Sequence, residues 1–180
     1  MNFMQFSPES KEKIEKLLTH FPPERRESAL IPVLHLAQKD FQALTPEVEE
    51  LVAQTLEVPI VRVRECLSFY EMFSDKPVGK YHFQVCWNIT CSLLGAEHLI
   101  DYLSKRLGIQ PGEVTKDGKF SLRGMECLGA CSEAPTMLVN EEPHYNLTEE
   151  KLDKMLKDLG VNGTTYNQTV ASGTPSPEAK

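Results

Sequence analysis

Two short stretches, Cys86-Trp-Asn-Ile-Thr-Cys91 and Cys127-Leu-Gly-Ala-Cys131-Ser-Glu-Ala-Pro135, hold four of the five cysteines of the chain in two close pairs. The residues between and beside these cysteines are mostly small, polar, glycine or proline, which is typical of loops. We therefore expect both pairs to lie in loops and not inside helices or strands. The rest of the chain should serve mainly to support these four thiols.

The overall composition is that of an ordinary globular protein. The chain has 180 residues, with 26 acidic and 19 basic side chains and a formal net charge of −7. Its hydrophobic content of 41% is sufficient for a core in one or two small domains. Phosphate binding needs a dense basic surface, and the sequence shows none, so we expect no nucleic-acid partner.

Neither a membrane span nor a secretion signal is expected. No apolar run reaches the roughly 18 to 20 residues that cross a bilayer, and residues 1–13 lack the features of a signal peptide. We therefore expect a soluble, intracellular protein with no direct membrane insertion. In a reducing cytosol, clustered cysteines are metal ligands or redox thiols more often than structural disulfides.

The N-terminal part, residues 1–75, has the hydrophobic periodicity of four short helices. Prolines mark the start of the first, third and fourth helix. The second helix should run from Glu24 to about Lys39, with Pro32 kinking it or loosening its first turns. Since this helical bundle carries no visible chemistry, we expect it to be a docking element.

After a polar junction at 74–79, the period changes and residues 80–160 alternate between strand and helix patterns. The predicted order is strand, helix, three strands, helix, which makes a small α/β sandwich and an α+β chain as a whole. Residues 161–180 are rich in polar residues, glycine and proline, and are expected to form a disordered tail. The predicted strands lie at 81–85, from 120 into Cys127, at 136–139 and near 145, and the predicted helices at 96–107 and 149–159.

Three chemistries suit paired thiols, and the spacing here is C-x4-C, 35 residues, then C-x3-C. Zinc sites favour tighter C-x2-C pairs but accept up to about four intervening residues. A thioredoxin-type dithiol needs C-x-x-C, which neither pair has. A 2Fe-2S cluster needs four thiolates, two for each iron, and two loops at one end of a sheet can supply them. The residues therefore favour a 2Fe-2S cluster, with zinc as the alternative.

The remaining candidate ligands do not change this interpretation. The five histidines show no metal-ligand spacing, which argues against a Rieske-type site with two histidine ligands. Cys66 stands alone in a predicted helix and is expected to be a small buried hydrophobic residue. No residue is predicted to be catalytic.

A family resemblance rests on these motifs. The C-x4-C and C-L-G-A-C-x-x-A-P motifs, with residues 112–120 and 69–73, resemble the thioredoxin-like 2Fe-2S subunit of bacterial respiratory NADH:quinone oxidoreductase, complex I. The similarity covers about residues 7–160. It implies a helical bundle followed by a thioredoxin-like ferredoxin domain. The cluster ligands that it implies are Cys86, Cys91, Cys127 and Cys131.

The resemblance also implies an electron-transfer subunit of an oxidoreductase, at the cytoplasmic face of the inner membrane. Its partners would be the subunit that binds FMN and NADH, and other subunits of the peripheral arm of complex I. FMN and NADH would be bound by that partner and not by this chain. The chain itself has no G-x-G-x-x-G motif between a strand and a helix, so hydride chemistry should belong to the partner. The isolated chain is then an electron carrier that exchanges one electron with FMN.

Three alternatives accompany this prediction. Similar modules occur as diaphorase subunits of NAD-linked hydrogenases and formate dehydrogenases. A zinc-stabilised interaction module and a stand-alone thiol oxidoreductase are alternatives from other functional classes. Bound iron, bound zinc or thiol–disulfide turnover would distinguish these classes.

Overall fold

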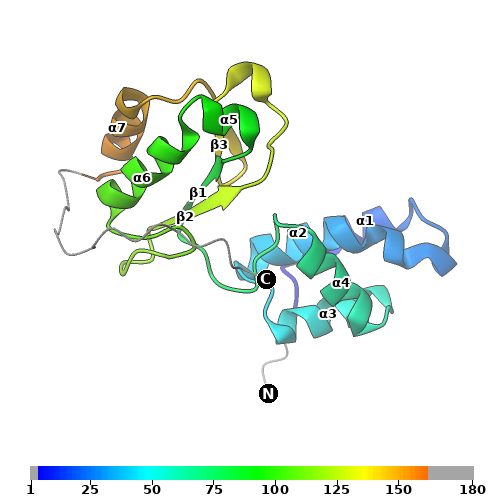
Figure 1. The fold of residues 1–180 in the computed structure, drawn as a ribbon. Coiled ribbons are helices and arrows are strands. Elements are labelled where there is room, and N and C mark those ends of the chain that lie inside the picture. Colours follow the sequence, from blue (N-terminus) through cyan, green and yellow to red (C-terminus); the bar gives the residue numbers. More distant parts are fainter. Residues whose placement is uncertain (1–3, 162–180) are drawn as a thin grey trace. The chain divides into compact units, whose positions relative to one another are not determined.

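The computed structural model describes residues 4–161. The chain divides after Val78 into two compact units, each with its own hydrophobic core (Figure 1). Residues 162–180, almost all of the predicted disordered tail, lie outside the described residues. Within the described part, no helix is both long and apolar enough to cross a membrane.

The first unit is built from helices. Its elements are α1 (Pro8–Leu18), the 3-10 helix η1 (Pro23–Ala29), α2 (Leu30–Phe41), α3 (Pro46–Leu56) and α4 (Ile60–Phe69). Each of the four predicted helices is present, but residues 23–29 form a 3-10 helix and α2 begins only at Leu30. Pro32 explains this difference, because its ring would clash with the carbonyl four residues earlier if the α-helix started upstream.

One apolar face of each helix fills the core of the first unit. Val33, Leu34, Val52 and Leu56 have no exposed surface, and they occupy neighbouring positions on the inner faces of α2 and α3. A polar contact fixes α1 to α2, because the carboxylate of Asp40 accepts hydrogen bonds from residues at the start of α1. The result is a small helical bundle.

The second unit contains a four-stranded mixed sheet. Its strands are β1 (Tyr81–Cys86), β2 (Phe120–Met125), β3 (Met137–Val139) and β4 (Glu142–His144). The strand order is β2-β1-β3-β4. β1 is parallel to β2, whereas the pairs β1–β3 and β3–β4 are antiparallel. The predicted strands are confirmed, except that the last strand ends before Tyr145.

Helices α6 (Ala96–Leu107) and α7 (Glu149–Asp158) pack beside each other, and α6 lies on β1 and β2 (Figure 1). Their buried leucines meet the sheet, where the rings of Phe83 and Phe120 stack with centroids 6.0 Å apart. Gly108 ends α6 in the left-handed conformation, as the sequence predicts. The predicted α+β class is confirmed. Two short helices, α5 (Ile89–Leu93) and the 3-10 helix η2 (Cys131–Glu133), complete this unit.

Candidate metal centre at the edge of the sheet

Both cysteine pairs begin at the same edge of the sheet. β1 and β2 are parallel, so their carboxyl ends lie side by side, and Cys86 is in register with Met125. Cys127 follows Met125 closely along the chain. Strand pairing therefore brings the first and third motif cysteines to one edge, although they are far apart in the sequence.

The expectation that both pairs lie in loops is only partly correct. Cys86 is the last residue of β1, Cys91 lies inside the helix α5, and Cys131 is the first residue of η2. The helix α5 forms because Asn88 caps it, with the side-chain oxygen of Asn88 accepting a hydrogen bond from the N–H of Ile89 at 2.9 Å. Of the four motif cysteines, Cys127 alone lies outside helices and strands.

The first pair of thiols is buried. Cys86 is 2% exposed and Cys91 is 1% exposed. Burial raises the pKa of the Cys91 thiol, and the neighbouring thiol of Cys86 raises it as well, while hydrogen bonds from Thr136 act in the opposite direction. The hydroxyl oxygen of Thr136 lies 3.8 Å from the Sγ of Cys91.

The second pair faces solvent. The Sγ atoms of Cys127 and Cys131 are 3.8 Å apart, and both residues are exposed. The backbone N–H of Gly129 donates a hydrogen bond to the Sγ of Cys127 at 3.4 Å. Gly129 has a φ of 76°, a left-handed conformation that favours glycine. The loop thus directs a backbone donor at a sulfur atom, which stabilises negative charge there.

The donor set fits a 2Fe-2S cluster in kind and number. All five cysteines are free thiols, and four of them form the two pairs at this edge. In residues 4–161 no three or more His, Cys, Asp or Glu side chains gather closely enough to hold a single metal ion. A 2Fe-2S cluster takes two thiolates on each iron, so one pair could serve each iron. Cys66 lies half-buried on α4, where burial raises the pKa of its thiol.

Three contacts of this site were not predicted. Thr136 contacts the first pair twice, through its hydroxyl near Cys91 and through its carbonyl, which accepts from the N–H of Cys86 at 3.0 Å. The side-chain amide of Asn88 donates to Glu126, next to Cys127, at 3.0 Å. In the sequence, only two local features point to these contacts: Asn88 is a residue type that favours helix N-caps, and Glu126 stands next to Cys127.

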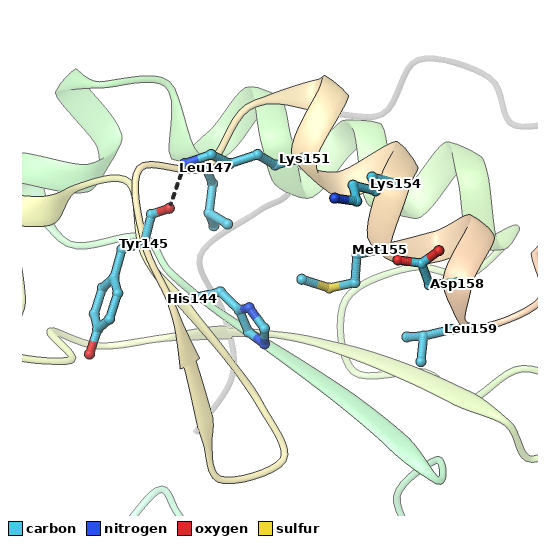
Figure 2. A pocket seen from close by; sticks show the side chains of 8 residues that line it. All are labelled: His144, Tyr145, Leu147, Lys151, Lys154, Met155, Asp158 and Leu159. Atoms are coloured by element: carbon cyan, nitrogen blue, oxygen red, sulfur yellow. Dashed lines mark hydrogen bonds between the residues drawn. The ribbon is translucent and has the colours of Figure 1, made fainter.

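A pocket of about 330 Å³ lies elsewhere in this unit, between β4 and α7 (Figure 2). Its lining is mainly apolar and includes Leu147, Met155 and Leu159. Lys151 also lines the pocket, but its ammonium group already donates to the carbonyls of Tyr145 and Asn146, at 3.2 and 2.8 Å. None of the cysteines lines this pocket, so it is separate from the candidate metal centre.

A mixed sheet with two pairs of cysteines at the end of its parallel strands defines a small α+β protein with a candidate metal centre. Residues 14–160 match the thioredoxin-like 2Fe-2S ferredoxins, and the chain belongs to this family. The thioredoxin-like fold and the 2Fe-2S cofactor expected from the motifs are therefore confirmed.

Relatives from two bacteria resemble the chain over most of its length. It is 40% identical over 157 residues to NADH-quinone oxidoreductase subunit 2 of Thermus thermophilus, a match that covers 87% of each chain. It is 44% identical over 149 residues to a subunit of the NADH-quinone oxidoreductase of Rhizobium meliloti, covering 83% of this chain and 88% of that relative.

A solved structure has the same fold. The crystal structure of an NAD+-reducing NiFe-hydrogenase in the air-oxidised state matches with a TM-score of 0.64 and 23% identity. The match covers 73% of this chain but only 22% of the hydrogenase chain. At this identity the likeness shows a common fold and nothing about the activity.

Proposed function

We propose that this chain is the electron-transfer subunit of an NADH:quinone oxidoreductase, complex I, with Cys86, Cys91, Cys127 and Cys131 as the ligands of one 2Fe-2S cluster. The observation that carries this proposal is the placement of two thiol pairs at one edge of the sheet. Relatives at about 40% identity that bear the name NADH-quinone oxidoreductase support the assignment to this complex.

When bound, the cluster would carry one electron at a time and exchange it with the FMN of a neighbouring subunit. The chain contributes the thiolates and the groups that stabilise their charge. The N–H of Gly129 and the hydroxyl of Thr136 lie where they can donate to sulfur. Such donors favour the more negative, reduced state and so raise the reduction potential.

The partner in this proposal is the subunit that binds FMN and NADH, within the peripheral arm at the cytoplasmic face of the inner membrane. Hydride chemistry belongs to that partner, because the chain has no G-x-G-x-x-G motif. The residues proposed here hold a one-electron centre and leave substrate binding to the partner.

The helical bundle, residues 1–75, is proposed to dock onto that partner. Phe69, at the end of α4, is 78% exposed, and nearby Met72 is 45% exposed. Exposed aromatic residues of this kind often anchor protein interfaces. In the full chain, Phe69→Ser should weaken capture of the FMN-binding subunit, whereas Lys11→Ser on α1 should not. Equal capture by the two variants would argue against docking through the end of α4.

The decisive experiment is electron paramagnetic resonance of the anaerobically purified full chain after reduction with dithionite. The proposal predicts a spin-one-half signal that disappears on reoxidation. Single Cys→Ser variants at 86, 91, 127 and 131 should each change or abolish the signal, whereas Cys66→Ser should leave it unchanged. Folded protein that contains zinc, no iron and no signal would overturn the proposal in favour of a structural metal module.

A diaphorase subunit of an NAD-linked hydrogenase or formate dehydrogenase is the second candidate. The fold match to the NAD+-reducing hydrogenase motivates it, although that match concerns the fold alone. Affinity purification of the chain from its own cells distinguishes the two candidates. Other NADH-quinone oxidoreductase subunits should be recovered if the leading proposal is correct, and hydrogenase or formate dehydrogenase subunits if the second one is.

A further inference from the structure

The indole ring of Trp87 lies directly on the backbone of Gly124. Trp87 follows Cys86 at the end of β1, and Gly124 lies in β2, in register with Val85. A Cβ atom at position 124 would stand 2.5 Å from Cε3 and 2.7 Å from Cζ3 of the indole. Gly124 does not have a positive φ. The glycine is therefore needed to leave room for the tryptophan ring, and not to allow an unusual backbone conformation.

Two hydrogen bonds join the same segments. The N–H of Trp87 donates to the carbonyl of Met125 at 3.0 Å. The side-chain amide of Asn88 donates to the carboxylate of Glu126 at 3.0 Å, while its oxygen caps α5. The residues directly after Cys86 are thus attached to the residues directly before Cys127.

Trp87 is also a large apolar residue at an exposed edge. Its side chain is 48% exposed, so about half of its surface is covered by the protein. Leu93, at the end of α5, is 82% exposed and gains far less from packing. Trp87 therefore differs from the other apolar residues of this segment, because it contacts the strand that leads to the second thiol pair.

We infer that Trp87, Asn88, Gly124 and Glu126 form a loop clamp that ties the segment after Cys86 to the segment before Cys127, and so fixes the position of one thiol pair relative to the other. This inference rests on the proposed four-cysteine ligand set. A cluster with four protein ligands is retained longer when its ligands are held in place before binding, because less ordering is needed. Trp87 is a positioning residue in this arrangement, since it acts on the cluster through the two loops.

Retention of the cluster tests the clamp. The full chain loaded with its cluster is mixed with an iron chelator, and the loss of visible absorbance is followed. Trp87→Ala and Gly124→Ala should each lose the cluster about five-fold faster than wild type, as expected for the loss of one good aromatic contact. The control, Leu93→Ala, should match wild type. The double variant Trp87→Ala, Gly124→Ala should be no faster than Trp87→Ala alone, because the added methyl group then meets no ring.

The reduction potential gives a second readout that fold stability alone would not change. Without the indole, the loop that follows β2 should hold the N–H of Gly129 less firmly near the Sγ of Cys127, and a weaker donor there disfavours the reduced state because that state carries one more negative charge. Trp87→Ala should therefore have a lower potential than wild type, and Trp87→Phe an intermediate one. Circular dichroism of the same samples checks that each variant is folded.

The possible outcomes separate this inference from the proposed function. Wild-type protein that takes up no iron would overturn both. Wild-type protein with a 2Fe-2S signal, together with a Trp87→Ala variant that matches Leu93→Ala in cluster loss and in potential, would overturn the clamp alone. A double variant that loses the cluster faster than Trp87→Ala alone would also count against the contact between the two residues.

Discussion

The hydroxyl oxygen of Thr136 lies 3.8 Å from the Sγ of Cys91, and both residues are almost fully buried. The carbonyl of Thr136 also accepts a hydrogen bond from the N–H of Cys86 at 3.0 Å. Thr136 is therefore an anchor for the backbone of the first thiol pair, and its hydroxyl lies close enough to one of the sulfur atoms to donate to it once that sulfur is a thiolate.

Thr136→Val removes the hydroxyl but keeps a side chain of similar volume. The lost donor should destabilise the reduced cluster, so the potential should fall by roughly tens of millivolts, as expected for a hydrogen bond to a charged group. Potentiometric titration followed by electron paramagnetic resonance measures this shift. Thr136→Ser is the matched control and should stay near the wild-type potential. An unchanged potential in Thr136→Val would mean that the hydroxyl does not donate to sulfur.

The difference in exposure between the two thiol pairs predicts their reactivity in the chain without cluster. Cys127 and Cys131 are exposed, whereas Cys86 and Cys91 are buried. Iodoacetamide should therefore modify the second pair first, with the site of modification read by mass spectrometry. Loading with the cluster should protect all four thiols and leave the slow reaction of Cys66 unchanged. Protection of only one pair would contradict the four-cysteine ligand set.

The order of helices and strands could be predicted because it depends on local hydrophobic periods. The helix α5 could not, because it has only five residues and exposes Ile89 and Leu93 by 72% and 82%, so few of its residues are buried to create a period. The break between η1 and α2 also has a local cause in Pro32. The sequence predicts loosened turns before this proline, but not a separate 3-10 helix.

The contacts around the thiols could not be predicted, because they depend on which strands become neighbours. Thr136 reaches Cys91 only because β1 pairs with β3, and these two residues are 45 positions apart. Trp87 meets Gly124 only because β1 also pairs with β2. A glycine inside a strand pattern does indicate a close approach of another group, but the sequence does not indicate that the group is Trp87.

His82 should make the folded chain less stable in mild acid. Burial, together with the charge of Arg123, lowers the pKa of His82 from 6.5 to about 4. Below pH 6.5 His82 binds a proton in the unfolded chain, but in the folded chain it stays neutral until about pH 4. The free energy of unfolding therefore falls through this window as the pH decreases. Because of His82, the free energy of unfolding should be roughly 2 kcal/mol lower at pH 5 than at pH 7.

Urea unfolding of the chain without cluster measures this effect. Wild type should lose more stability between pH 7 and pH 5 than His82→Gln, which cannot take up the proton. Ser121, whose hydroxyl lies 2.7 Å from Nδ1 of His82, provides the control. Ser121→Ala should lower stability at both pH values but leave a pH dependence close to that of wild type. Identical pH dependence in wild type and His82→Gln would refute the assignment to His82.

Position 79 should not tolerate any side chain larger than that of glycine. A Cβ atom there would clash with the carbonyl carbon of Phe120 and lie 2.6 Å from the backbone nitrogen of Ser121. Backbone atoms of a paired strand cannot move aside as a flexible side chain can, so Gly79→Ala should lower the free energy of unfolding by about 3 kcal/mol. Gly112→Ala is the control, because its added methyl group would meet no atom within 4 Å and only its φ of +92° is unfavourable. That variant should lose roughly 1 kcal/mol. Urea unfolding compares the two, and an equal or smaller loss for Gly79→Ala would show that β2 can shift away from residue 79.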